Sequence, residues 1–89
     1  MLTMAAFTPV PTSEIMATWN SISDAREYFK VSQPDWAKVA AALGDETLDE
    51  MGLLAGVDDS DYRTARDESG LNPLKKGAVN LVFGAIKTR

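Results

Sequence analysis

The chain contains neither cysteine nor histidine in its 89 residues, and this absence limits how it can fold. Disulfides and cysteine-based zinc sites are excluded, so a hydrophobic core must stabilise the fold unaided. Apolar residues make up 45% of the chain and charged residues 25%, which are ordinary proportions for a globular protein. A chain of this length buries a modest fraction of its surface. We therefore expect one domain of modest stability.

The missing residue types also bear on function. Histidine is the commonest general acid or base and the commonest transition-metal ligand, and cysteine is a common nucleophile. An enzyme built from this chain would have to use carboxylates, lysines, tyrosines or hydroxyls, and no motif arranges them. Asp49 with Asp61 is an example of an acid pair that abundance alone explains. We predict a non-enzymatic protein without cofactor, metal ion or small-molecule substrate.

The N-terminal segment does not have the pattern of a signal peptide. It lacks a basic region before its apolar residues, and Pro9 and Pro11 follow at once. No apolar run approaches the ~18 residues of a membrane span. We expect a soluble, cytoplasmic or nuclear protein with no membrane partner, in which residues 1–11 form a flexible arm and residues 12–89 a single helical domain.

Helix signals recur throughout residues 12–89. The clearest segment in the first half opens at Ser32, places Trp36, Val39 and Leu43 on one face, and ends at Gly44. No stretch alternates as a strand does. The sequence predicts an all-α fold, a compact bundle of about five helices with a long C-terminal helix. The expected segments begin at 12–14 and 32–35, and run over about 24–31, 47–55, 60–68 and 73–87.

Cap residues support two of these segments. Thr47 followed by Glu50 fits a capping box and predicts that a helix begins at residue 47. Asn72 as N-cap with Pro73 in the first turn predicts the start of the last helix.

The last helix has an unusually wide apolar arc, of roughly 200° at 100° per residue. A helix that faces only a core needs little more than ~100°. Gly77 and Gly84 lie seven residues apart near one face, where small residues allow another backbone to approach. The arc is explained either by a central core helix or by contact with another chain, and the sequence leaves both open.

Charge is divided along the chain. All thirteen acidic residues lie at or before Glu68, together with five basic residues, which gives a net charge of −8. The remaining residues carry four basic and no acidic side chains, a net of +4, so the whole chain is at −4. Lys75 and Lys76 lie where the helix dipole is already positive, which suits an acidic partner.

These charges define two candidate partner-binding surfaces. Complementary surfaces on one molecule permit head-to-tail contact between copies, and we predict an adaptor or scaffold module that binds protein, including a second copy of itself. The basic surface comprises Lys75, Lys76, Gly77 and Lys87, and the acidic middle comprises Asp45, Glu46, Asp49, Glu50, Asp58, Asp59 and Asp61.

Several short motifs follow one another over about residues 15–87. They are Trp19, Met51-Gly52-Leu53-Leu54, Asp58-Asp59-Ser60-Asp61-Tyr62, Gly70-Leu71, Leu74-Lys75-Lys76 and the apolar run from Val79 to Ile86. Their order resembles that of the sterile alpha motif (SAM) family. The resemblance implies a bundle of about five helices with a long last helix, which associates through the start of that helix and an acidic middle surface. The link Arg63–Ser69 is longer than in the family, and Lys75-Lys76-Gly77 replaces a Gly-His-Arg turn.

Three other functions fit the sequence less well. A nucleic-acid-binding domain is the alternative function, because Lys75, Lys76, Lys87 and Arg89 share one helix; yet the isoelectric point is near 4.6. A calmodulin-like or membrane-surface target helix would need more lysines. A calcium loop beginning at Asp59 has no suitable ligands at its fifth and twelfth positions.

Overall fold

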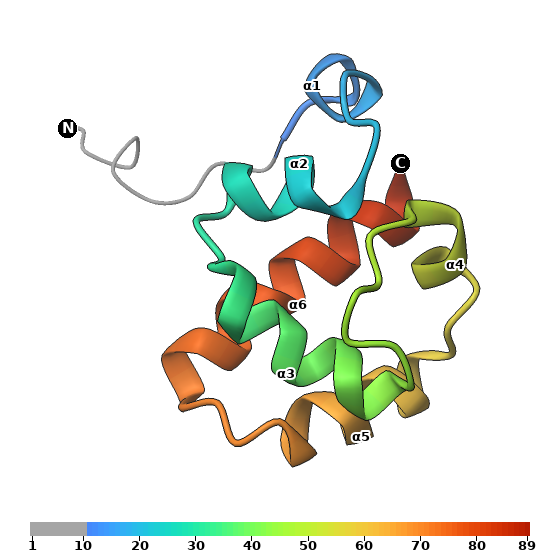
Figure 1. The fold of residues 1–89 in the computed structure, drawn as a ribbon. Coiled ribbons are helices and arrows are strands. Elements are labelled where there is room, and N and C mark those ends of the chain that lie inside the picture. Colours follow the sequence, from blue (N-terminus) through green and yellow to red (C-terminus); the bar gives the residue numbers. More distant parts are fainter. Residues whose placement is uncertain (1–10) are drawn as a thin grey trace, which may run out of the picture.

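A computed structural model describes residues 11–89 of the chain. The expected arm, residues 1–11, lies outside the described residues except for Pro11, which is buried. The described part is all-α and forms a bundle without strands (Figure 1). Its helices are α1 (Ser13–Ala17), α2 (Ile22–Tyr28), α3 (Gln33–Leu43), α4 (Met51–Ala55), α5 (Asp59–Glu68) and the long α6 (Pro73–Thr88).

Several helix ends follow from local side-chain chemistry, as predicted. The Thr12 hydroxyl accepts from the Ile15 amide at 3.1 Å, and the Asn72 carbonyl oxygen accepts from the Lys75 amide at 2.9 Å. Each bond satisfies a backbone donor that the first helical turn leaves without a partner. Gly44 ends α3 with φ 115°, a left-handed conformation that glycine adopts without strain.

The start of α4 differs from the sequence prediction. The helix begins at Met51 and not at residue 47, so the Thr47–Glu50 capping box is wrong. Asp45 Oδ1 instead accepts from the Thr47 amide at 3.0 Å and from its hydroxyl at 2.7 Å. This local turn competes with helix formation.

A further difference concerns the start of α2. Helix α2 begins at Ile22, two residues before the predicted start, with Ser21 at the N-cap position. Residues 11–89 hold six helices, one for each of the six segments that the sequence predicts, and two of them, α1 and α4, are only five residues long.

The core forms around one face of α6. Helix α6 contacts α2, α4 and α5, while α3 packs on α5 (Figure 1). Val79 and Val82 of α6 are completely buried, and Trp36 of α3 is only 1% exposed. The Trp36 indole also donates to the Leu48 carbonyl at 3.2 Å, which holds the α3–α4 connection against the core.

Candidate interaction surfaces

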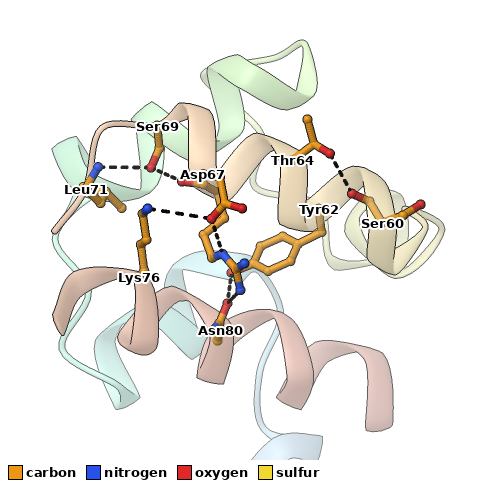
Figure 2. A network of polar contacts seen from close by, with 9 residues as sticks. Ser60, Tyr62, Thr64, Asp67, Ser69, Leu71, Lys76 and Asn80 are labelled. Atoms are coloured by element: carbon orange, nitrogen blue, oxygen red, sulfur yellow. Dashed lines mark hydrogen bonds and ion pairs between the residues drawn. The ribbon is translucent and has the colours of Figure 1, made fainter. Parts of the chain in front are cut away.

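The two lysines at the start of α6 face acidic residues of their own chain. Lys75 Nζ lies 3.3 Å from Asp35 Oδ2, and Lys76 Nζ lies 3.7 Å from Asp67 Oδ1 (Figure 2 shows the second pair). Neither partner belongs to the predicted acidic middle. The Lys75 side chain is 50% exposed but that of Asp35 only 16%, whereas the Lys76 and Asp67 side chains are 32% and 58% exposed. Solvent-exposed pairs contribute only ~0–1 kcal/mol to stability. Both lysines are therefore paired within the chain, Lys76 weakly.

Asp67 belongs to a polar network that joins α5 to α6 (Figure 2). Arg66 Nε donates to Asp67 Oδ1 at 3.1 Å, and its Nη1 donates to Asn80 Oδ1 at 3.2 Å. Tyr62 Oη donates to the same Asn80 oxygen at 3.0 Å. The Arg66 hydrogen bond lowers the pKa of Asp67, with a smaller contribution from Lys76. This network was not predicted, because its α5 residues meet Lys76 and Asn80 of another helix, up to 18 residues away in the sequence.

Lys87 has a structural role. Its Nζ donates to the carbonyls of Ala55 at 2.9 Å and Val57 at 2.8 Å. These carbonyls lie at and just beyond the C-terminus of α4, where a cation is favourable. The ammonium group also lies 5.5 Å from the centre of the Phe83 ring. Lys87 thus joins the end of α4 to α6 and does not extend the basic surface.

Two residues of the acidic middle form hydrogen bonds within the chain. Asp49 Oδ1 accepts from the Ser23 amide at 2.8 Å and from its hydroxyl at 2.7 Å, in the first turn of α2. Asp45 accepts from Thr47, and these bonds lower the pKa of its carboxyl group. Asp49 therefore joins the segment before α4 to α2, and Asp45 supports a local turn.

The other acidic candidates are exposed, and two of them line a groove. Asp58 and Asp61, with Glu68, border a hollow of about 460 Å³ between the end of α3 and α5. Leu43, Val57 and Ala65 supply its apolar lining. Glu68 was not among the predicted site residues, although its helical spacing of seven from Asp61 could have suggested it. Glu46, Glu50 and Asp59 are exposed outside this groove.

The outward face of α6 is apolar and uncovered by the described residues. Leu74 is 85% exposed and Leu81 is 44% exposed, while the opposite side of the helix is buried. Gly77 and Gly84 lie exposed on the same face, and a Cβ atom added at either would meet nothing within 4 Å. We call Leu74, Gly77, Leu81, Gly84 and Thr88 the outward face. Leu74 and Leu81 were predicted as parts of the wide arc, but not as site residues.

Comparison with protein-family models, with curated proteins and with solved structures finds no match to this chain. None of the described helices is long and apolar enough to cross a membrane. Within residues 11–89, no three acidic side chains are grouped so that they could hold a metal ion.

Proposed function

We propose that this chain is a non-enzymatic protein-interaction module, an adaptor or scaffold, whose principal contact surface is the outward face of α6. The observation that carries the proposal is the exposure of Leu74 and Leu81 on a helix whose other side completes the core. Removing apolar surface from water contributes ~25 cal/mol per Å², so a partner that covers both leucines gains free energy.

The spacing of these leucines separates them from ordinary exposed apolar residues. Single exposed leucines are common on folded proteins and need no explanation. Leu53 on α4, which is 58% exposed, is such a case. Leu74 and Leu81 lie two helical turns apart on one face, with glycines between and beyond them. Together they form a continuous apolar strip on which a partner helix can lie.

Head-to-tail contact through charge is a second mode that we propose for the same module. Lys75 and Lys76 of one copy would bind Asp58 and Asp61 at the acidic groove of the next. The pairs with Asp35 and Asp67 would have to exchange first. This exchange costs little for the more exposed Lys76–Asp67 pair and more for Lys75–Asp35, because the Asp35 side chain is only 16% exposed. Self-association in the manner that the SAM resemblance implies would use these residues.

The nucleic-acid alternative gains no support from the arrangement of the basic residues. Lys76 lies beside Asp67, and Lys87 donates to carbonyls of α4. A phosphate-binding surface needs several clustered cations, and the outward face of α6 presents leucines instead.

The test compares a charge-disrupted outward face with a matched control. We immobilise the wild type, Leu74→Asp/Leu81→Asp and Leu53→Asp. Each is incubated with a cell lysate that also contains a differently tagged copy of the chain, and the retained proteins are quantified. We expect wild type and Leu53→Asp to retain the same protein and the double variant to lose it. Equal retention by all three folded chains would contradict the proposal.

A further inference from the structure

We infer that the partner on the outward face of α6 is a second copy of this chain, which docks antiparallel about a two-fold axis that crosses the outward face at the level of residue 79. The inference rests on the proposed function, since it names the occupant of the same surface.

The first reason is the order of large and small residues. Leu74, Gly77, Leu81, Gly84 and Thr88 are spaced alternately by three and four residues, which is the spacing of a helix–helix seam. In an antiparallel pair centred at the level of residue 79, residue 74 of one copy lies opposite residue 84 of the other, and residue 77 lies opposite residue 81. Each leucine then meets a glycine, in both halves of the contact.

This complementarity is specific to an antiparallel pair. In a symmetric dimer the same surface serves both copies, so it must be complementary to itself. A parallel pair in register would set leucine against leucine and glycine against glycine, which leaves crowded and empty layers in turn. A leucine over a glycine instead fills the space of the absent side chain and lets the two backbones approach closely.

The second reason is that the fold itself does not require the glycines. Glycine inside a helix is unfavourable relative to alanine. Gly77 and Gly84 have no left-handed φ, unlike Gly44, and open space surrounds the position of a Cβ at each. Their small size has no use within the described chain. It has a use where the leucine of a neighbour lies against the helix.

The third reason is the absence of repulsion. Ala78, Asn80 and Ala85 flank the outward face and are uncharged. Helix α6 has no acidic residue, its Lys75 and Lys76 are paired with Asp35 and Asp67, and Lys87 is held by the carbonyls of α4. Two copies can therefore approach along α6, although each carries a net charge of −4.

The size of the contact sets its strength. A helix of 16 residues is about 24 Å long, so one α6–α6 contact buries less than the ~1,200 Å² of a stable standard interface. We expect a concentration-dependent dimer and not an obligate one.

The first experiment measures association of the full chain by sedimentation equilibrium. Wild type should shift from monomer to dimer with concentration, and Gly77→Ala/Gly84→Ala should raise the dissociation constant at least about tenfold while its monomer melts at a higher temperature. Gly52→Ala, at an exposed glycine of α4 with equally open surroundings, should associate as wild type does. A wild type that stays monomeric at every concentration overturns the inference, as does unchanged dimerisation of the double variant.

The second experiment tests the antiparallel arrangement and uses the absence of native cysteine. Ala78→Cys places a thiol next to the axis, whereas Thr88→Cys places the two thiols about 27 Å apart along an antiparallel pair. A short bismaleimide should link copies of Ala78→Cys and leave Thr88→Cys unlinked. Linkage of both indicates a parallel pair, and linkage of neither indicates another contact, so each result overturns the inference.

The two proposals can fail separately. If wild type is monomeric but a foreign protein is still lost from Leu74→Asp/Leu81→Asp, the inference is overturned and the proposed function stands. If residues 1–10 of the same chain cover the outward face, the full chain remains monomeric, and this too overturns the inference.

Discussion

At the scale of single residues, Trp36 combines near-complete burial with a side-chain hydrogen bond. Its ring is 1% exposed, and its indole nitrogen donates to the Leu48 carbonyl in a segment without regular structure. A buried carbonyl that loses its donor costs ~1–3 kcal/mol.

We expect Trp36→Phe to lower the free energy of unfolding by about 2–4 kcal/mol, because it removes both this bond and packed volume. Trp19→Phe is the control, since Trp19 is also buried but forms no side-chain hydrogen bond with residues 11–89. Urea titration of both variants measures the difference. Equal losses would show that the indole–carbonyl bond contributes nothing.

Tyr62 makes stability depend on alkaline pH. Burial raises the pKa of its phenol well above the ordinary value near 10, in spite of the opposing charge of Arg66. Because the folded-state pKa is the higher one, the contribution to stability is complete below about pH 10 and is lost as pH rises above it.

We therefore expect the free energy of unfolding to fall between about pH 10 and 11, and tyrosinate absorbance of Tyr62 to appear only with unfolding. Tyr62→Phe should reduce this pH dependence, whereas Tyr28→Phe should retain it. A Tyr62 phenol that ionises in the folded protein below pH 10 would contradict the assignment.

At the scale of helices, glycine has opposite roles in α3 and α6. Gly44 ends α3 with positive φ, while Gly77 and Gly84 have ordinary helical backbone and open surroundings.

We expect Gly77→Ala and Gly84→Ala each to stabilise the monomer by about 0.5–1 kcal/mol, and Gly44→Ala to destabilise it by about 1 kcal/mol. Thermal unfolding at high dilution measures these effects without contribution from association. Destabilisation by the α6 substitutions would mean that some part of the chain packs on them.

Lys87 adds a polar contact between two helices that also pack on each other in the core. Helix α4 is five residues long, and the carbonyls at its end accept from the Lys87 ammonium group.

We expect Lys87→Met to lower stability by about 0.5–1.5 kcal/mol and to speed amide hydrogen exchange in residues 51–57. Arg89→Met, at the exposed last residue, is the control and should change neither quantity. Unchanged exchange in α4 would show that water replaces the lysine without loss.

At the scale of the whole molecule, the charge division and the outward face predict different kinds of association. Head-to-tail contact joins opposite charges and must weaken as salt screens them, with a Debye length of ~8 Å at physiological ionic strength. Contact through Leu74 and Leu81 buries apolar surface and is not weakened by salt.

We expect wild type and Lys75→Glu/Lys76→Glu to sediment alike at low and high salt if the outward face is the contact. If the charged surfaces are the contact, wild type should associate more strongly at low salt, and the double variant should stay monomeric. Monomers under all conditions would leave only a foreign partner for this module.

The sequence alone determined the fold class and several helix ends, because their causes lie within one helical turn. The caps at Thr12 and Asn72 and the stop at Gly44 use atoms three or four residues apart. The predicted capping box at Thr47 was wrong for an equally local reason, since the Asp45 carboxylate accepts from both the amide and the hydroxyl of Thr47.

Only the tertiary structure decided what the charges and the wide apolar arc of α6 do. Lys75 contacts Asp35, 40 residues away in the sequence, and Lys87 contacts Ala55, 32 residues away. No local sequence pattern predicts contacts between residues so far apart in the chain. Likewise, the sequence showed that α6 is apolar over a wide arc, but the packing of α2, α4 and α5 determined which side is buried. The outward face is the side of α6 that those helices leave uncovered. Only the packing of neighbouring helices decides which side of α6 is buried and which is exposed.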